Sequence, residues 1–242
     1  MQWDILTGPV PEIPRKAIVL HLAGVVRGDS AALAANTSLA LRVCNAARSA
    51  GAKHLFIASS AAVYGRGGCD HAETDVPYPV SDYGRAKMMM EDAVIQWQRG
   101  AGPDAPGVTC LRIGNVVGAD ALFGQRVAGP LTRLDQGAGF GAGPIRSYIG
   151  PRALGFVLAQ LLCRADRGSA LPDILNVAAP QPVAMAELLA AAERDFSFEP
   201  AGENVIEKVS LSTARLAALV TERTQSPAEM IADWQSLVAV AR

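Results

Sequence analysis

The sequence predicts a doubly wound α/β fold, in which helices cover both faces of a parallel sheet. Short unalternating apolar runs, at 17–22, 54–58 and 108–113, alternate along the chain with longer segments of helical periodicity. An unalternating run is typical of a strand that is buried on both faces. Regular alternation of such strands with helices indicates parallel βαβ units. With 242 residues, the chain is long enough for one large domain, or one domain with a small appendage.

The composition is that of an ordinary enzyme, half apolar with few aromatic residues. The formal net charge of −1 suggests neither nucleic acid nor an anionic membrane surface as a partner. The apolar stretches are much shorter than a membrane span, and no secretory signal is visible at the N-terminus. The four cysteines and three histidines are scattered along the chain. We therefore predict no metal site and expect a reducing, cytoplasmic compartment.

The N-terminal segment leads into the first predicted strand. Residues 1–15 are rich in proline and are expected to form a loop. The strand over 17–22 is followed by Ala23 and Gly24, and such small residues let a ligand approach the backbone closely. A helix over 30–50 follows, because its apolar residues recur near helical spacing and a glycine ends the pattern.

The next strand and helix carry the residues that suggest chemistry. The strand over 54–58 runs into a pair of serines that ends with Ser60. After a loop rich in glycine and proline, a helix extends from about Tyr83 to about Arg99. Tyr83 and Lys87 are four residues apart, so they share one face of this helix. We expect Ser60, Tyr83 and Lys87 to converge at the carboxyl ends of the strands, where open α/β sheets bind ligands.

Such a trio suits proton transfer beside a hydride transfer. A free phenol has a pKa of about 10, which is too high for a base at neutral pH. A nearby ammonium group favours the phenolate and lowers that pKa. A serine hydroxyl can hold the reacting oxygen in line. The Tyr-x-x-x-Lys spacing alone more often marks a surface pair, and it is the preceding strand and serines that favour the catalytic interpretation.

The second half of the chain is predicted to be a mixed region. Residues 119–150 are irregular and rich in glycine, and we interpret them as a mobile loop on the substrate side. The elements expected after this loop are a helix over 151–164, a strand over 174–178, a helix over 183–194, a strand over 205–211 and a last helix that opens at Ser226.

In their order, these motifs resemble those of the extended short-chain dehydrogenase/reductase family, the nucleotide-sugar epimerases and dehydratases. The segments that carry the resemblance are Ser-Ser-Ala-Ala-Val-Tyr-Gly at 59–65, Tyr-Gly-Arg-Ala-Lys at 83–87, Leu-Arg-Ile-Gly-Asn-Val-Val-Gly at 111–118 and Arg-Ser-Tyr-Ile at 146–149. The resemblance implies a Rossmann-like sheet. It makes 1–118 a partial dinucleotide-binding domain and 119–242 a small substrate-binding region with a substrate-binding loop, a returning strand and C-terminal helices.

The resemblance also implies a role for each matching residue. Ser60 would anchor the substrate hydroxyl, Tyr83 would act as general acid and base, and Lys87 would tune Tyr83 and hold the cofactor ribose. The residues assigned to an NAD or NADP cofactor are Asp4, Ile5, Leu22, Ala23, Gly24, Asn36, Tyr83, Lys87 and Gly114. Those assigned to the substrate are Ser60, Asn115 and Arg146, with Arg126 as a further candidate partner for a phosphate.

The sequence departs from the family at two functional places. It has no glycine-rich strand-to-helix turn to seat a cofactor pyrophosphate, so we expect an N-terminally truncated version of the fold. The strand over 17–22 would then be an exposed edge. The acidic pair that dehydratases of the family carry after the Ser60 position is replaced by Ala61 and Ala62, which disfavours dehydration.

These observations predict an NAD(P)-dependent enzyme, an isomerase of the epimerase type or an oxidoreductase of the reductase type. Its substrate would be a nucleotide-sugar or a related carbonyl or hydroxyl compound. The alternative is a non-catalytic ligand-binding or assembly subunit that has lost cofactor binding. Because the family often pairs through the helix that carries Tyr83 and the helix before it, the resemblance also implies a homodimer.

Overall fold

The computed structural model describes residues 3–65, 70–124, 132–136, 143–202, 205–221 and 223–240. The chain divides into two compact units, each made of separate segments. The first comprises Met1–Gly65, Val76–Arg112 and Gln160–Leu175, and the second comprises Arg66–Asp75, Ile113–Ala159 and Asn176–Arg242. The two regions predicted from the sequence, 1–118 and 119–242, are by contrast continuous segments of the chain.

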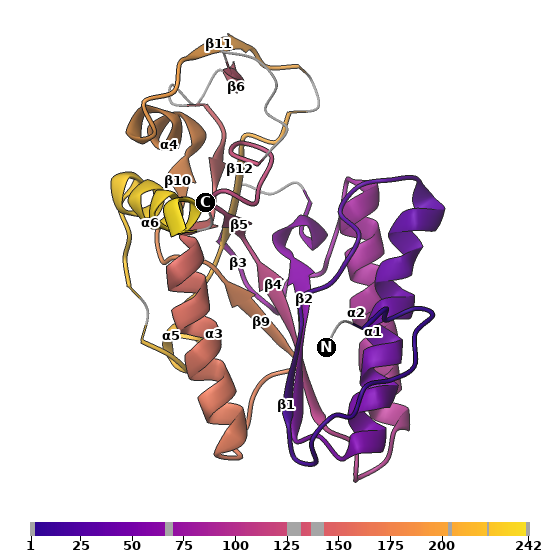
Figure 1. The fold of residues 1–242 in the computed structure, drawn as a ribbon. Helices are drawn as coiled ribbons and strands as arrows, with labels where there is room; N and C mark the ends of the chain where they lie inside the picture. Colours follow the sequence, from indigo (N-terminus) through magenta and orange to yellow (C-terminus); the bar gives the residue numbers. More distant parts are fainter. Residues whose placement is uncertain are drawn as a thin grey trace. The chain divides into compact units, whose positions relative to one another are not determined.

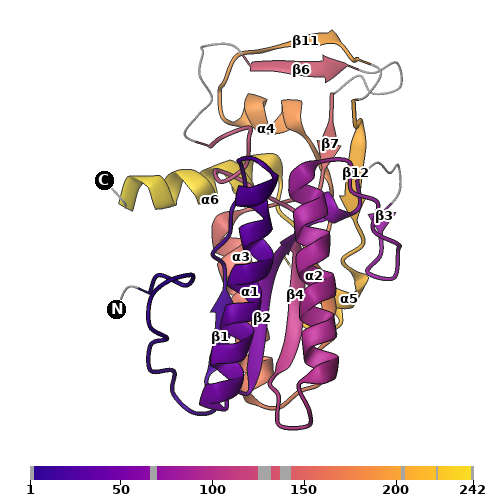
Figure 2. The same ribbon diagram turned by 90° about the vertical axis from the view of Figure 1, so that its right-hand side faces the viewer.

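The first unit is built on a sheet with strand order β1-β2-β4-β9. These strands are β1 (Ile18–His21), β2 (His54–Ser60), β4 (Gly107–Ile113) and β9 (Ile174–Val177), the last of which begins in this unit. β1 pairs with β2 in parallel. Helices α1 (Ser30–Ala50) and α2 (Asp82–Gly100) lie side by side on one face, and the C-terminal half of α3 (Pro151–Asp166) lies on the other (Figures 1 and 2). The predicted doubly wound α/β class is confirmed.

Local sequence explains where the first two helices begin and end. The Asp29 carboxylate accepts a hydrogen bond of 2.8 Å from Ala32 N and caps α1, and Gly51 ends that helix in the left-handed conformation at φ 66°. The Ser81 hydroxyl accepts one of 3.0 Å from Gly84 N and caps α2. Their apolar faces form one core with the sheet, including Ala40, Val43, Cys44, Leu55, Ile57, Met90, Val94 and Cys110.

Gly84 brings α2 against the short 3-10 helix η1 (Ala61–Val63) that follows β2. A Cβ at position 84 would lie 2.4 Å from the Ala62 carbonyl oxygen, so only glycine permits this approach. Because Tyr83 precedes Gly84 and Ser60 precedes η1, the close contact sets the tyrosine beside the serine.

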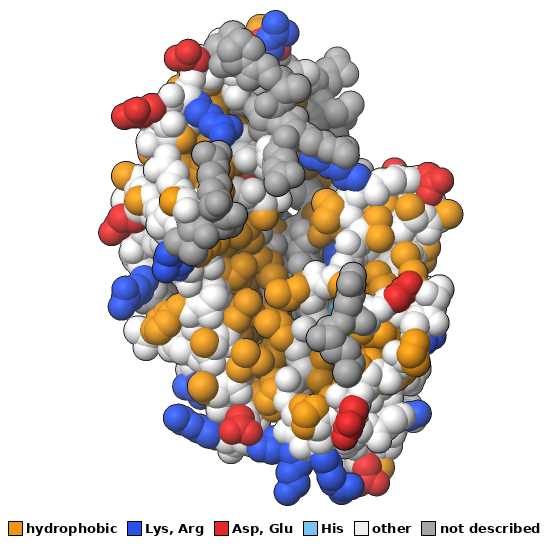
Figure 3. Space-filling view, in the orientation of Figure 1, with side chains coloured by type: hydrophobic (Ala, Val, Ile, Leu, Met, Phe, Trp, Pro, Cys, Tyr) orange, Lys and Arg blue, Asp and Glu red, His pale blue; other side chains and the backbone are white. Residues whose placement is uncertain are grey.

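β1 forms the edge of the sheet, as predicted. Leu22 and Val26 follow it and are 56% and 63% exposed. Hydrophobic side chains are numerous on the face of the molecule around this strand (Figure 3). No helix in the described ranges combines the length and the apolar character needed to cross a membrane.

The second unit holds three small sheets, ordered β10-β7-β12-β3, β11-β6 and β5-β8. Its strands are β3 (Asp70–His71), β5 (Asn115–Val116), β6 (Thr132–Gln136), β7 (Ile145–Arg146), β8 (Tyr148–Ile149), β10 (Val183–Ala184), β11 (Phe196–Pro200) and β12 (Lys208–Leu211). Its helices are the N-terminal half of α3, α4 (Met185–Ala191), α5 (Ala214–Ala217) and α6 (Pro227–Val240). The core includes Val117, Leu122, Phe123, Tyr148, Leu188, Leu189, Met230 and Ile231.

In this unit the structure differs from the sequence predictions. Residues 119–150 were expected to be irregular, but they contain β6, which pairs in parallel with β11 from Thr132 opposite Phe196. The helix expected over 183–194 starts two residues later, because Val183 and Ala184 pair with β7. Each difference arises from pairing with a segment distant in sequence, which local periodicity does not register.

Candidate functional site

The structure brings Ser60, Tyr83 and Lys87 together in the first unit. The Ser60 side chain hydrogen-bonds Tyr83. Lys87 Nζ lies 5.9 Å from the centre of the Tyr83 ring and donates a hydrogen bond of 2.8 Å to Ala58 O, near the end of β2. Lys87 is only 4% exposed, so its ammonium group is held in place rather than free in solvent.

Gly24 and Asn36 adjoin the same lysine. A Cβ on Gly24 would lie 2.7 Å from Asn36 Oδ1 and 3.3 Å from Lys87 Nζ. The buried Asn36 side chain fixes the segment after β1, because Oδ1 accepts from Val25 N at 3.2 Å and Nδ2 donates to Val25 O at 2.8 Å. The segment after β1 and the N-terminal part of α2 therefore lie close together, and glycine, amide and ammonium groups line the space beside them.

Four other residues predicted to contact a cofactor, Asp4, Ile5, Leu22 and Ala23, are either exposed or held by contacts of other kinds. Leu22 and Ala23 are exposed beyond the end of β1. The Asp4 carboxylate accepts hydrogen bonds from Leu6 N, Thr7 N and Thr7 Oγ1 within its own turn. Ile5 packs against the core formed by α1, α2 and the sheet. These contacts account for Asp4 and Ile5 structurally and do not bring them to Lys87.

Burial dominates the electrostatics of this site. It raises the pKa of Tyr83 above 10.0, with the Ser60 hydrogen bond acting in the opposite direction. It lowers the pKa of Lys87 from 10.5 to about 8, and Cys110 and Glu91 oppose this shift. Lys87 was expected to lower the pKa of Tyr83. In the protein alone that pKa is instead raised, because desolvation of the phenolate is the largest effect on it.

Asn115 and Arg146, two of the three residues predicted to bind substrate, line one cavity of about 420 Å3 in the second unit. Its apolar lining comprises Leu122, Leu134, Met185, Val205 and Ile206. Gly114, which precedes Asn115, allows the backbone to pack closely, because a Cβ there would lie 2.4 Å from Ser147 O. This contact explains the glycine by packing alone.

Arg146 is a half-buried cation whose partners are backbone carbonyl groups. Its guanidinium donates to Ile145 O at 2.8 Å, Glu207 O at 3.2 Å and Ile206 O at 2.6 Å. Burial lowers its pKa, but an arginine remains charged at any physiological pH. The carbonyl groups thus orient the Arg146 guanidinium, which lines the cavity, without neutralising its positive charge.

Asp120 and Tyr148 also belong to this cavity region and were missed by the sequence analysis. Tyr148 Oη donates a hydrogen bond of 2.9 Å to Asp120 Oδ2, and the Asn115 side chain hydrogen-bonds both. Burial raises the pKa of Asp120. No spacing rule links these positions, and Asp120 lies four residues beyond the end of β5. Arg126, the further candidate partner for a phosphate, lies outside the described residues.

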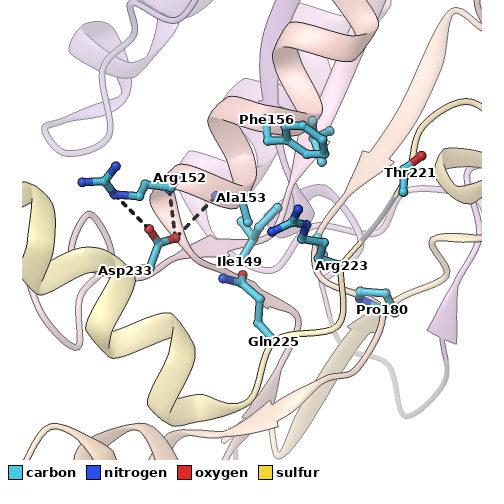
Figure 4. Close-up of a pocket in the computed structure, with 11 residues that line it drawn as sticks. Ile149, Arg152, Ala153, Phe156, Pro180, Thr221, Arg223, Gln225 and Asp233 are labelled. Atoms are coloured by element: carbon cyan, nitrogen blue, oxygen red, sulfur yellow. Dashed lines mark hydrogen bonds and ion pairs between the residues drawn. The ribbon is translucent and has the colours of Figure 1, made fainter.

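A second cavity, of about 330 Å3, lies where α3 begins (Figure 4). Its walls are mostly apolar, and Arg223 stacks over Phe156 with 5.6 Å from Cζ to the ring centre. The Asp233 carboxylate accepts from Arg152 N at 3.0 Å and so holds the start of α3. Because this carboxylate is engaged structurally, we place the candidate chemistry at Tyr83 instead.

A protein family and several solved structures are similar to this chain. The model of the NAD dependent epimerase/dehydratase family matches residues 13–134. No curated protein matches the chain. Among solved structures, MoeE5 in complex with UDP-glucose and NAD is 21% identical with a TM-score of 0.73, over 93% of this chain and 80% of that one.

Two further solved structures are similar. A UDP-glucose-4-epimerase from Stenotrophomonas maltophila with bound NAD and formylated UDP-arabinopyranose is 20% identical, with a TM-score of 0.74 over 93% of this chain and 77% of that one. A UDP-glucuronic acid 4-epimerase from Bacillus cereus is 14% identical, with a TM-score of 0.77 over 99% of this chain and 81% of that one. At these identities the likeness establishes the fold.

Proposed function

The chain belongs to the NAD dependent epimerase/dehydratase family, and from this premise we propose that it is an NAD(P)-dependent epimerase or reductase of a nucleotide-linked sugar. The observation that carries the proposal is the convergence of Ser60, Tyr83 and Lys87 in the first unit. Similar structures hold NAD with a UDP-sugar, which supports this substrate class. Ala61 and Ala62, at the start of η1, provide no acid for a dehydration.

The residues at the ends of β1 and β2 fit the cofactor that the family implies. Gly24 keeps open a space that a Cβ would fill against Asn36 and Lys87. An ammonium has three N–H donors. Since Lys87 gives one to Ala58 O and one to Met90 Sδ, the third is left for a ribose hydroxyl. When bound, the nicotinamide ring accepts or returns a hydride and, in its oxidised form, adds a positive charge.

The protein's own groups would then manage the proton. Tyr83 would take the proton from the substrate hydroxyl, and Ser60, its hydrogen-bond partner, would hold the reacting oxygen. Since burial raises the pKa of Tyr83, the phenolate needs positive charge beside it. Lys87 supplies one such charge from within the fold, and the oxidised nicotinamide would supply a second when the cofactor is bound.

Cofactor binding followed by turnover tests the proposed function. We expect the 242-residue chain to bind NADH or NADPH in the micromolar range, measured by nicotinamide fluorescence. The loaded protein should then interconvert UDP-glucose and its C4 epimer, or reduce a keto-sugar nucleotide, with the products separated by chromatography. Failure to bind either nucleotide would refute the proposal and favour a non-catalytic binding or assembly role.

Arg146→Met is expected to weaken binding of UDP by about 10- to 100-fold. The guanidinium is the cation that the cavity directs by three carbonyl contacts, and a charge-assisted bond to a phosphate contributes about 1.5–3 kcal/mol. The dissociation constant of UDP would be measured by calorimetry. Arg146→Lys should retain part of the affinity, because it keeps the charge but loses the bidentate geometry.

The matched control is Arg133→Met. Arg133 lines the same cavity, but its side chain is 68% exposed and pairs with Glu199 at 3.1 Å, so UDP affinity should change less than threefold. An equal loss of affinity in both variants would contradict the assignment of Arg146, and so would a normal affinity in Arg146→Met.

Two finer expectations remain part of the proposal. A homodimer through α1 and α2 is supported by Met89, which is exposed on α2. A cytoplasmic location is supported by the free thiols of Cys44, Cys110 and Cys163, because such thiols persist in reducing compartments.

A further inference from the structure

Helix α2 buries a second charged residue one turn after Lys87. Tyr83, Lys87 and Glu91 are spaced by four, so they lie along one face of the helix. Helix α2 contacts β2 and η1. Glu91 is 2% exposed. A carboxylate buried to this extent must be paired and hydrogen-bonded if it is to remain charged.

Arg112 on β4 provides that pairing. Its Nη2 donates to Glu91 Oε2 at 2.8 Å and its Nε to Oε1 at 3.1 Å. Nη1 donates to Tyr64 Oη at 2.9 Å, and the guanidinium carbon lies 4.7 Å from the centre of the Tyr64 ring. Because every guanidinium nitrogen is engaged, Arg112 holds the Glu91 carboxylate in a fixed place.

Glu91 also completes a series of contacts between α2 and the end of β2. Ala58 O accepts from Lys87, the Ser59 hydroxyl donates to Glu91, and Ser60 hydrogen-bonds Tyr83. Three successive strand residues thus meet the three residues of one helix face. The Ser59 contact lies next to the serine that is proposed to hold the reacting oxygen.

Among the titratable groups that the structure describes around Lys87, Glu91 is the one that is negatively charged near pH 7. Burial lowers the pKa of His21 on β1 to about 4 and holds the pKa of Cys110 on β4 well above its usual value, so both are neutral near pH 7. Tyr83 is neutral as well, because its pKa is raised. Burial lowers the pKa of Lys87, and Cys110 and then Glu91 oppose that shift. Of these two opposing groups, only the Glu91 carboxylate carries a full negative charge near pH 7.

We propose that Glu91, fixed by Arg112, is a positioning residue of this site, which keeps Lys87 protonated and holds Ser59 and Ser60 at the end of β2. The proposal rests on the proposed function for its catalytic meaning. Its electrostatic part concerns the cofactor-free protein and stands independently. Glu91 is thus not expected to touch substrate or cofactor, and it acts through the two residues that do.

The test is the titration of Lys87 in the cofactor-free protein, followed by NMR of the labelled lysine side chains. The chain has four lysines, so Lys16, Lys53 and Lys208 serve as internal references. In Glu91→Gln, the midpoint for Lys87 should move down by about one pH unit or more. The matched control, Asp92→Asn, changes an exposed acid on the same helix and should leave the midpoint unchanged.

A second variant keeps the test decisive if Glu91→Gln fails to fold. Glu91→Leu combined with Arg112→Met replaces the ion pair by apolar groups, an exchange that proteins often tolerate. The Lys87 midpoint should fall in this variant too, by less than in Glu91→Gln, because the opposing charge of Arg112 is removed together with the carboxylate. An unchanged midpoint in a folded variant would overturn the proposal and leave the pair a structural role only. Because no cofactor or turnover is involved, this outcome is distinct from failure of the proposed function.

Turnover provides an additional measurement once activity is found. If charged Lys87 is required, the alkaline limb of the kcat/KM profile should move to lower pH in Glu91→Gln. A purely structural defect would lower kcat/KM at every pH without moving the limb.

Discussion

Tyr83→Phe should reduce kcat by about 10²- to 10⁴-fold, the usual contribution of a general acid or base. The substitution removes one hydroxyl and keeps the ring that lies 5.9 Å from Lys87 Nζ. The packing that Gly84 permits between α2 and η1 should be unaffected. Affinity for NADH should therefore change little, and the loss should fall on kcat. Steady-state kinetics with a UDP-sugar, together with nicotinamide fluorescence, would separate the two quantities.

Tyr78→Phe is the matched control, because Tyr78 is 73% exposed and is assigned no part in the site. It should retain full turnover. Unchanged turnover in Tyr83→Phe would show that another group moves the proton, and the assignment of Ser60 as its partner would fail with it.

Lys87→Met should abolish most activity and yet stabilise the protein at neutral pH. Burial lowers the pKa of Lys87 from 10.5 to about 8, and this difference corresponds to about 3 kcal/mol of destabilisation when the ammonium is charged. Loss of the hydrogen bond to Ala58 O costs about 1 kcal/mol in return. We expect a net gain of about 1–2 kcal/mol at pH 7, measured by urea unfolding.

The pH dependence of this gain has a defined sign. Between pH 8 and 10.5 the unfolded wild-type chain binds the Lys87 proton and the folded chain does not, so wild-type stability rises with pH in that window. The methionine variant lacks this rise. Its advantage should be complete below pH 8 and should shrink, then reverse, as the pH approaches 10.5.

Lys16→Met, at an exposed lysine, is the control and should show no such trend. If Lys87→Met were less stable than the wild type at pH 7, burial of the charged ammonium would not destabilise the folded protein. Lys87 would then be mainly a structural residue.

The sequence predicted the first unit well because its elements are locally encoded. The helix expected over 30–50 is α1 with those bounds, and its caps at Asp29 and Gly51 are local signals. The strands expected over 54–58 and 108–113 correspond to β2 and β4. Apolar periodicity and caps act over a few residues, so they are visible without the fold.

The Glu91–Arg112 pair was missed, although its members carried a signal. Glu91 continues the four-residue spacing of Tyr83 and Lys87 on the buried face of α2, and Arg112 interrupts a strand that is otherwise apolar. A charge at either position requires a partner. The sequence does not state that the two charges meet, because they lie on different elements and their contact depends on how α2 packs on the sheet.

By itself, the sequence determined the fold class, the helices and strands of the first unit, and the family to which Ser60, Tyr83 and Lys87 point. Tertiary structure alone decided the pairing of β6 with β11, the place of Arg146 in a cavity with Asn115, and the balance by which burial raises the pKa of Tyr83 and lowers that of Lys87. Periodicity and caps are properties of neighbouring residues, whereas strand pairing, cavities and desolvation depend on which distant segments exclude water together.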